Sequence, residues 1–350
     1  MVLGYLDKRI TYPKGMYDSA CAYGFAYHPG ALAIEVRGSC GADEEWLCQL
    51  YGFTFERSCG EDLPENYDKD AAWNEYIDRI CGYLKDGVPV ITPRGWIAEQ
   101  KGSEVRSKSG MRGFWWDGLG SKERPDTHFF VITGIDKTEG LFYMNDPIWG
   151  WFGKGRDETG PLSGLRKSVE RQAPGLRYLT YAFRKSDAPP IPDKMVWQVV
   201  RQRIGKKIEG DSKVYDKPQK HYCHYGINGW RSFRKDLEPA QFTRILRLRK
   251  ERQGYDAVPV LAWQRLRLYH HHFMAKISAD YLEEQKRVDD WAWLVDLEVL
   301  YRQMCVANEQ IIAALSASKD LDTGVAKAMP ALRKMQHLVD RVIEHLGTFK

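Results

Sequence analysis

The chain has 350 residues, 43% of them hydrophobic and 28% charged, and a formal net charge of +5 at pH 7. These values are typical of a globular protein with room for two domains. Neither a run of about eighteen apolar residues nor a signal-peptide pattern at residues 1–15 occurs, which argues against a membrane-spanning segment and leads us to expect a cytoplasmic location.

The first half of the chain combines helix patterns with short strand patterns, so we expect a mixed α and β domain there. In residues 70–87 the apolar side chains Trp73, Ile77, Ile80 and Leu84 recur every three or four positions, as on the buried face of a helix. We expect this helix to pack on a sheet. The other predicted elements are a helix at 42–52 and strands at 88–98, 128–135, 140–147 and 177–185.

Two segments of this half show neither pattern. Residues 96–127 are charged and contain glycine, yet they hold Phe114, Trp115 and Trp116. Loops of this length are usually functional or disordered, so the segment is interpreted either as a lid over a substrate or as a packed insertion. Residues 153–164 are rich in glycine but lack a phosphate-binding pattern, and we expect a loop.

The composition changes at the proline-rich segment 186–194. Long amphipathic runs with few strand signals follow it, so we place the domain boundary there and expect a helical domain at 195–350. Helical periodicity is clearest at 225–238, 257–286, 289–317 and 323–346. The basic run at 244–253 has no accompanying groove-reading motif, and we interpret it as a solvated helix face.

The cysteines and histidines do not form a recognisable metal motif. No CxxC pair occurs, which argues against a disulfide framework and a structural zinc site. Histidines gather at 221–226 and 269–273, but no carboxylate completes a ligand set at suitable spacing, so we predict no metal and no cofactor. Most cysteines are expected to be buried, with one reactive, and Cys48 and Cys81 fall in predicted helix interiors, where we expect them to be packing residues. The seven are Cys21, Cys40, Cys48, Cys59, Cys81, Cys223 and Cys305.

Residues 127–147, THFFVITGIDKTEGLFYMNDP, place a histidine at the start of one predicted strand and an aspartate at the end of the next. In a two-stranded ribbon these ends are neighbours, so a turn at DKTEG would bring Asp146 next to His128. A cysteine nucleophile needs such an imidazole to form its thiolate near neutral pH, and the imidazole needs an acceptor that fixes its tautomer. The alternative is structural, because Asn145 and Asp146 before Pro147 are good turn formers.

These residues carry a resemblance to a known superfamily. An upstream cysteine, the LKDGVPVIT strand at 84–92, then HFFVITGID and FYMNDP resemble the papain-like cysteine peptidases, the bacteriocin-processing peptidases among them. Segments 224–237 and 271–315 are similar in pattern to the helical domain of the butirosin biosynthesis protein H-like family. The resemblance implies a papain-like fold and a Cys-His-Asp triad with His128 as base and Asp146 as its orienter. It also implies acyl transfer from an acyl carrier protein to an amine through an acyl-enzyme thioester.

Two cysteines compete for the role of nucleophile. Cys21 lies about as far before the LYGFTF element at 50–55 as the family cysteine lies before its Gly-Phe element, and this favours Cys21. Cys40 is the alternative, because Cys40 with Gly41 resembles the CG of the peptidase branch at the start of a helix. Acidic residues in the first turn of that helix would disfavour a thiolate at Cys40.

One departure from the family pattern leaves open that the chain is a catalytically silent relative. Papain-like peptidases usually carry a glutamine shortly before the nucleophile as an oxyanion donor, and this chain has none before Gln49. Backbone N–H groups would have to hold the oxyanion instead.

The sequence as a whole predicts an α+β protein with a papain-like domain at 1–187, followed by an all-α helical domain at 195–350. The predicted function is that of a cysteine-dependent acyltransferase or of an amide or thioester hydrolase. The alternative is a catalytically silent papain-like binding or scaffold protein. We expect a small-molecule or peptidyl acyl substrate or an acyl carrier protein as partner, and neither nucleic acid nor a membrane.

Overall fold

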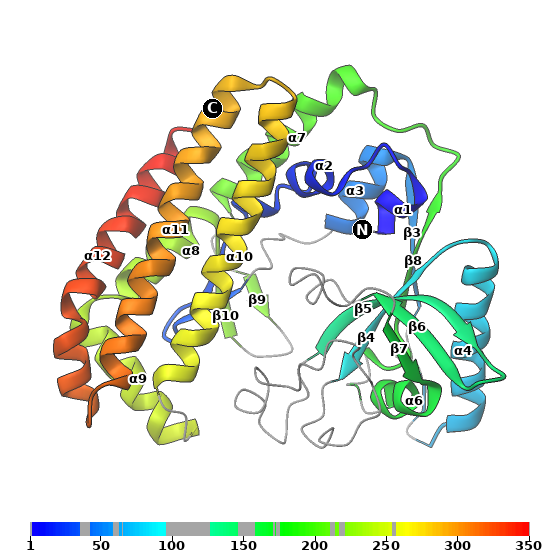
Figure 1. Ribbon diagram of the computed structural model, residues 1–350, viewed down its shortest axis with the longest axis horizontal. Coiled ribbons are helices and arrows are strands. Elements are labelled where there is room, and N and C mark those ends of the chain that lie inside the picture. The colour runs from blue at the N-terminus through cyan, green and yellow to red at the C-terminus, as the bar shows by residue number, and fades with distance from the viewer. Residues whose placement is uncertain are drawn as a thin grey trace. The chain divides into compact units, whose positions relative to one another are not determined.

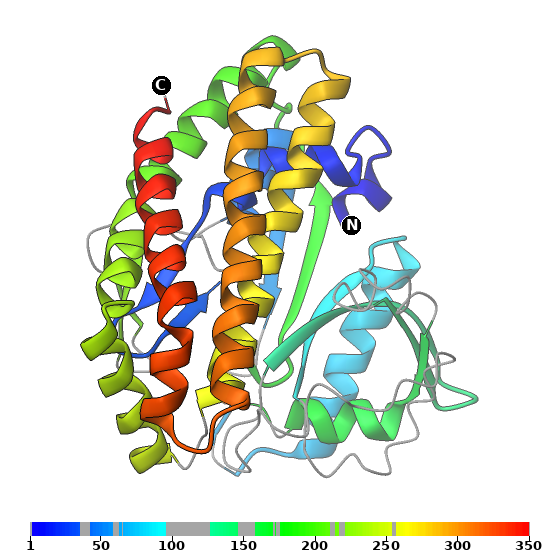
Figure 2. The same cartoon turned by 60° about the vertical axis from the view of Figure 1, so that its left-hand side comes forward.

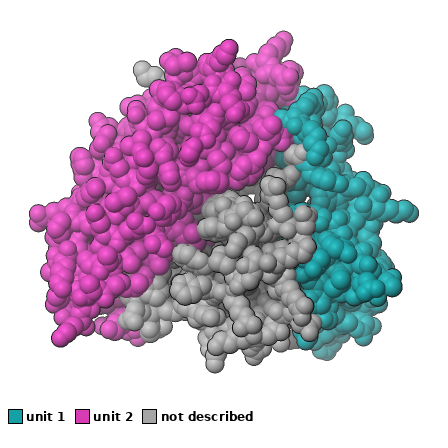
Figure 3. All heavy atoms as spheres, in the orientation of Figure 1, with its two compact units in different colours: residues 1–9, 48–190 teal, residues 10–47, 191–350 magenta. Residues whose placement is uncertain are grey.

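A computed structural model describes the chain in two units. The described residues are 2–35, 43–58, 63–64, 66–95, 127–145, 158–170, 172, 176–210, 214–216, 221–253 and 257–349. Residues 1–9 and 48–190 form the first unit, and residues 10–47 and 191–350 form the second (Figure 3). The second unit thus includes residues 10–47, which we had expected in the first domain.

The first unit is built on a six-stranded antiparallel sheet with the strand order β3-β8-β4-β5-β6-β7 (Figure 1). Its elements are α1 (Val2–Leu6), β3 (Phe53–Ser58), α4 (Lys69–Lys85), β4 (Val90–Gly95), β5 (Thr127–Asp136), β6 (Leu141–Asn145), β7 (Glu158–Pro161), α6 (Leu162–Glu170) and β8 (Thr180–Lys185). Helix α3 (Asp43–Tyr51) contains the point where the chain passes from the second unit to the first. The strands predicted from the sequence correspond to β4, β5, β6 and β8.

Helices α4 and α6 pack on this sheet through one apolar core. Alternate residues of a strand face the same side of a sheet, and those of β5 and β6 on this side are buried together with residues of both helices. The core includes Val90, Phe130, Ile132, Phe142 and Met144 from the strands and Tyr76, Ile77, Ile80, Leu165 and Val169 from the helices. The predicted packing of helix 70–87 on a sheet is confirmed.

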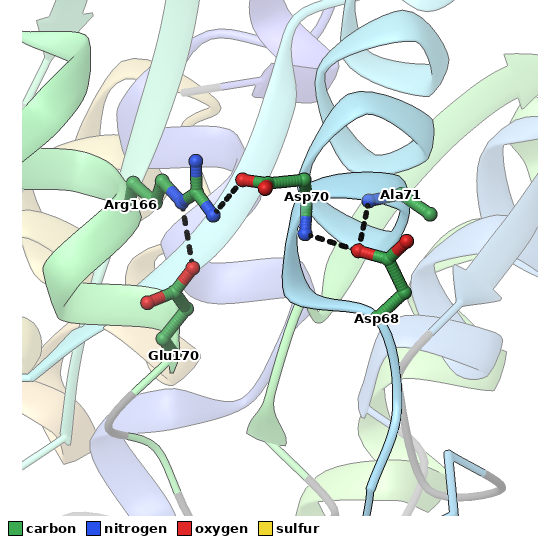
Figure 4. Close-up of polar contacts among 5 residues, drawn as sticks. All are labelled: Asp68, Asp70, Ala71, Arg166 and Glu170. Carbon is green, nitrogen blue, oxygen red and sulfur yellow. Dashed lines mark hydrogen bonds and ion pairs between the residues drawn. The ribbon is translucent and has the colours of Figure 1, made fainter.

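A polar network joins the start of α4 to α6 (Figure 4). The Asp68 carboxylate caps α4 by accepting hydrogen bonds from the backbone N–H groups of Asp70 and Ala71, at 2.9 and 3.1 Å. The Arg166 guanidinium of α6 donates to Asp70 at 2.5 Å and to Glu170 at 2.7 Å. Because these groups are largely solvated, we expect them to align the two helices more than to stabilise them.

The prediction of a loop at 153–164 is wrong for the second half of this segment. Strand β7 begins at Glu158, and α6 begins at Leu162. Gly160 explains why the strand was missed, because a Cβ there would lie 2.7 Å from the ring of Phe142, so this position of β7 cannot carry the β-branched residues typical of strands. Residues 96–127, interpreted as a lid or a packed insertion, lie outside the described residues except for Thr127.

The second unit contains three long helices, α10, α11 and α12, that lie side by side (Figure 2). Its elements are α2 (Tyr12–Asp18), the 3-10 helix η1 (Cys21–Tyr23), β1 (Ala26–His28), β2 (Ala33–Glu35), α7 (Asp193–Glu209), β9 (Val214–Asp216), β10 (His221–Tyr225), α8 (Gly226–Asp236), α9 (Pro239–Gln253), α10 (Ala257–Glu284), α11 (Val288–Ser316) and α12 (Leu321–Gly347). The four helices predicted in this part correspond to α8, α10, α11 and α12.

The expectation of an all-α second domain is wrong, because the second unit also holds an antiparallel sheet with the order β2-β1-β10-β9. Ala26 in β1 pairs with Tyr225 in β10, and the Phe25 carbonyl accepts from the Gly226 backbone N–H at 2.8 Å. The Phe25 ring stacks on Trp230 of α8 with 3.5 Å between ring centroids. These contacts explain why residues 10–47 belong to the second unit.

Candidate functional site

Strand β5 carries the predicted catalytic histidine. His128 is its second residue and lies opposite Arg94 of β4 in the antiparallel register. On the other side β5 pairs with β6, where Val131 lies opposite Asn145, and the register shifts by a bulge between Ile132 and Gly134. Strand β5 is thus paired with β4 from its start and with β6 from Val131 onward, so both neighbours hold it at Val131 and Ile132.

A chain of buried hydrogen bonds links α4 and β4 to the residue that precedes β8. The Tyr76 hydroxyl of α4 lies 2.7 Å from the Thr92 hydroxyl, which donates to the Leu179 carbonyl at 2.8 Å. Among the described residues, β4 and β8 are paired at Ile91 and Tyr181 alone, so these hydrogen bonds add a second link between the two segments. Burial raises the pKa of Tyr76, which therefore stays a neutral hydroxyl.

The described pairing of β5 with β6 ends one residue before the predicted aspartate. Asn145, the last residue of β6, lies opposite Val131, three residues along β5 from His128. Three residues of a strand span about 10 Å. Asp146 follows Asn145 in the sequence but lies outside the described residues, and so does the side chain of His128.

Cys21 begins the short helix η1 of the second unit. Its predecessor Ala20 has a φ angle of 52°, in the left-handed region that residues with a side chain rarely adopt. Ala20 and Ala22 are fully buried, and Tyr23 is 2% exposed. The backbone of Cys21 therefore runs through a closely packed part of this unit. Its side chain lies outside the described residues, as does all of Cys40.

Polar side chains bond to the backbone just before η1. The ammonium group of Lys207, which is 2% exposed, donates to the Ser19 carbonyl at 2.9 Å. The Trp46 indole N–H donates to the Asp18 carbonyl at 3.0 Å. The sequence did not single out Lys207, because a lysine on an amphipathic helix is ordinarily solvated.

Four further cysteines are described, and none of them forms a disulfide within the described part of the chain. Cys48 in α3 is buried, and Cys81 in α4 is half-buried against the core of the first unit, which confirms their assignment to helix interiors. Cys223 and Cys305 are also buried. Burial raises the pKa of the Cys305 thiol to about 12, so that thiol stays protonated and unreactive at neutral pH. Cys59 lies outside the described residues.

The histidine-rich segments lie on β10 and α10. Within the described ranges no group of three or more histidine, cysteine or acidic side chains could hold a metal ion. On α10, His271 is fully buried and His272 lies 2.9 Å from the Glu298 carboxylate. In the same part of the chain no helix is long and apolar enough to cross a membrane.

The comparison with known families bears on the first half of the chain. Residues 34–172 match the Peptidase_C39 like family. This match supports a relation of that segment to the papain-like cysteine peptidase superfamily, as the sequence motifs had indicated. The matched segment contains Cys40, His128 and Asp146, and it begins after Cys21. No curated protein matches the chain.

Proposed function

We propose that this protein is a papain-like cysteine enzyme of acyl transfer, with His128 as the base and Asp146 as the residue that orients it. The family match supports this proposal, because the matched segment contains Cys40, His128 and Asp146, the three residue types of the proposed triad. The pairing of β5 with β6 is consistent with it, since Asp146 follows a residue held against β5. An aspartate there would fix the tautomer of the imidazole.

Cys40 is the nucleophile that we propose, with Cys21 as the alternative. The matched segment includes Cys40 and starts thirteen residues after Cys21, at residue 34. Cys21 is also flanked by Ala20 and Ala22, both fully buried, whereas a nucleophile must be accessible to its substrate. The positional argument from the LYGFTF element still favours Cys21, so the experiment below has to separate the two.

The proposed reaction has two steps. The cysteine thiolate attacks the carbonyl carbon of an amide or thioester, and the imidazolium of His128 protonates the leaving amine or thiol as its bond to that carbon breaks. The acyl-enzyme thioester is then attacked by an acceptor, whose proton passes to His128 while the cysteine leaves. An amine acceptor would make the enzyme a transferase, as in the butirosin biosynthesis protein H-like family, and water would make it a hydrolase.

Intact-protein mass spectrometry with a limiting amount of a short-chain acyl N-acetylcysteamine thioester tests the proposal. We expect one acyl group per chain in the wild type and none in Cys40→Ser, while Cys21→Ser still acylates. Cys81→Ser is the matched control, because this thiol is free and half-buried, outside the proposed site. Loss of the adduct in Cys21→Ser alone would reassign the nucleophile.

The fate of the adduct separates the proposed activities from the silent alternative. Adduct that disappears only when a primary amine is added indicates a transferase, and adduct that disappears in buffer indicates a hydrolase. If no adduct forms, or if the adduct forms equally well without the imidazole of His128, the enzyme proposal is contradicted and a papain-like binding protein is favoured.

A further inference from the structure

The interface between α10 and α11 holds polar side chains on a buried face. Gln264, His271 and Ser278 of α10 follow one another at intervals of seven residues, and they are 1%, 0% and 0% exposed. Positions seven apart lie on the same face of a helix. From α11, Asn308 donates to the Gln264 side chain at 2.8 Å, and the Tyr301 ring lies 5.6 Å from His271. Polar side chains therefore occupy buried positions of this interface that apolar side chains could fill.

His271 lies among aromatic rings. Its centroid is 5.6 Å from Phe25, which precedes β1, 6.5 Å from Trp230 of α8 and 5.6 Å from Tyr301 of α11. Neither of its ring nitrogens has a hydrogen-bond partner in the described part of the chain. A buried polar group without a hydrogen-bond partner is destabilising, so even the neutral imidazole is an unfavourable side chain at this position.

The groups that face His271 do not favour its positive charge. Phe25 and Trp230 present uncharged rings, and α11 presents the Tyr301 hydroxyl, whose pKa is raised by burial. On α10 itself the guanidinium of Arg267 repels an imidazolium, and no described carboxylate opposes this effect. Burial first and Arg267 second lower the pKa of His271 to about 3. The neighbouring His270 has its pKa lowered to about 3 as well, mainly by burial.

The aromatic rings could in principle attract the imidazolium. An aromatic face attracts a cation placed over it. Taking an ion out of water costs more than this attraction returns, even after the protein relaxes, and the rings around His271 are tilted by 45–58°. The desolvation cost is therefore the larger of the two effects.

We propose that His271 makes the second unit acid-sensitive, because protonation of its imidazole can occur only when α10 separates from α11 and α8. The direction of the pH effect follows from proton binding by the opened and the closed states. The opened chain binds a proton near pH 6.5, whereas the closed unit does not until the pH falls to about 3. The stability of the closed unit is therefore fully present above pH 6.5, and it is lost progressively as the pH falls from 6.5 toward 3.

Hydrogen exchange of the whole protein, read by mass spectrometry on peptides from α10 and α11, tests this proposal. The opening equilibrium constant of these peptides is compared between the wild type and His271→Gln, which is neutral at every pH, from pH 7.5 to 4.5. We expect the ratio of the two constants to rise about tenfold per pH unit below pH 6.5. Acidic groups and His270 are common to both proteins, so the ratio isolates His271.

His337→Gln is the matched control, because His337 is an exposed histidine on α12 of the same unit. Its ratio to the wild type should not change with pH. A ratio for His271→Gln that is equally flat would overturn the proposal, and so would a ratio that falls with decreasing pH, since the rings would then stabilise the imidazolium.

A second measurement needs no variant and tests the proposal for His271 even if His271→Gln does not fold. Exchange of the imidazole C2 hydrogen in the wild type reports the titration of each histidine in the native protein. We expect the midpoint of His271 to lie at least two pH units below 6.5, the ordinary pKa of a histidine side chain. A midpoint of His271 near 6.5 in the folded protein would overturn the proposal.

Discussion

At the scale of single residues, Asp236 is a buried carboxylate that ties the β1–β2 hairpin to α8. It is 4% exposed, and it accepts from the Tyr27 hydroxyl at 2.9 Å and from the Gly30 backbone N–H at 2.5 Å. Asp236→Ala should lower the free energy of unfolding of the second unit by about 3 kcal/mol, because the buried Tyr27 hydroxyl and the Gly30 backbone N–H both lose their acceptor. Urea unfolding measures this value.

Asp340→Ala serves as the comparison for Asp236, because Asp340 is a largely exposed carboxylate on α12 that pairs with Arg234 at 3.0 Å. A solvated pair contributes less than about 1 kcal/mol. Equal losses in the two variants would mean that the acceptor role of Asp236 is unimportant.

The burial of a residue was predictable from the sequence where the periodicity of a single helix determines it. Cys48 and Cys81 were placed correctly from helix periodicity alone. The burial of Lys207 and of His271 was not predictable, since it depends on Ser19 and on Phe25, which lie far away in the sequence.

At the scale of elements, two glycines of the second unit have opposite roles. Gly226, between β10 and α8, has a φ angle of 56°, and a Cβ there would meet the carbonyl oxygens of Ile208 and Lys207. Gly205 lies inside α7, and a Cβ there meets no described atom within 4 Å. Gly226→Ala should therefore destabilise the unit by more than about 2 kcal/mol, whereas Gly205→Ala should stabilise it by about 0.5–1 kcal/mol.

Thermal unfolding followed by circular dichroism measures both glycine variants. A midpoint that rises in Gly226→Ala, or one that falls in Gly205→Ala, would contradict these backbone assignments.

The predictability of an element followed the strength of its own pattern. The long helices α4, α10, α11 and α12 have apolar faces that a single segment reveals. Strands β1 and β9 have three residues each, and β1 pairs with β10 almost two hundred residues later. Because such short strands depend on their partners, the sequence predicted neither of them.

At the scale of the whole molecule, residues 191–350 need residues 10–47. Without them β10 loses its partner β1, and Trp230 loses the stacked ring of Phe25. We expect the isolated fragment 191–350 to lack cooperative unfolding, and the added peptide 10–47 to restore it. The same peptide with Phe25→Ala should restore it far less. Cooperative unfolding of 191–350 alone would contradict this account.

The candidate site was only partly predictable from the sequence. The order of motifs around His128 and Asp146 indicated the superfamily that the match of residues 34–172 supports. The choice between Cys21 and Cys40 stayed open, because it rested on spacing along the chain, and neither spacing nor local pattern reveals which segment is packed in the interior.

The central claim is that one cysteine is activated by His128. The most direct test is the rate of alkylation by limiting iodoacetamide between pH 6 and 8, read by peptide mass spectrometry in the wild type and in His128→Ala. Cys81 and Cys305 provide internal references, the latter because burial raises its thiol pKa to about 12.

We predict that Cys40 labels at a rate nearly independent of pH in this range, and about 100-fold more slowly in His128→Ala. An ordinary thiol would instead label about tenfold faster per pH unit. If Cys40 and Cys21 both follow that ordinary dependence, and His128→Ala leaves their rates unchanged, the claim is contradicted.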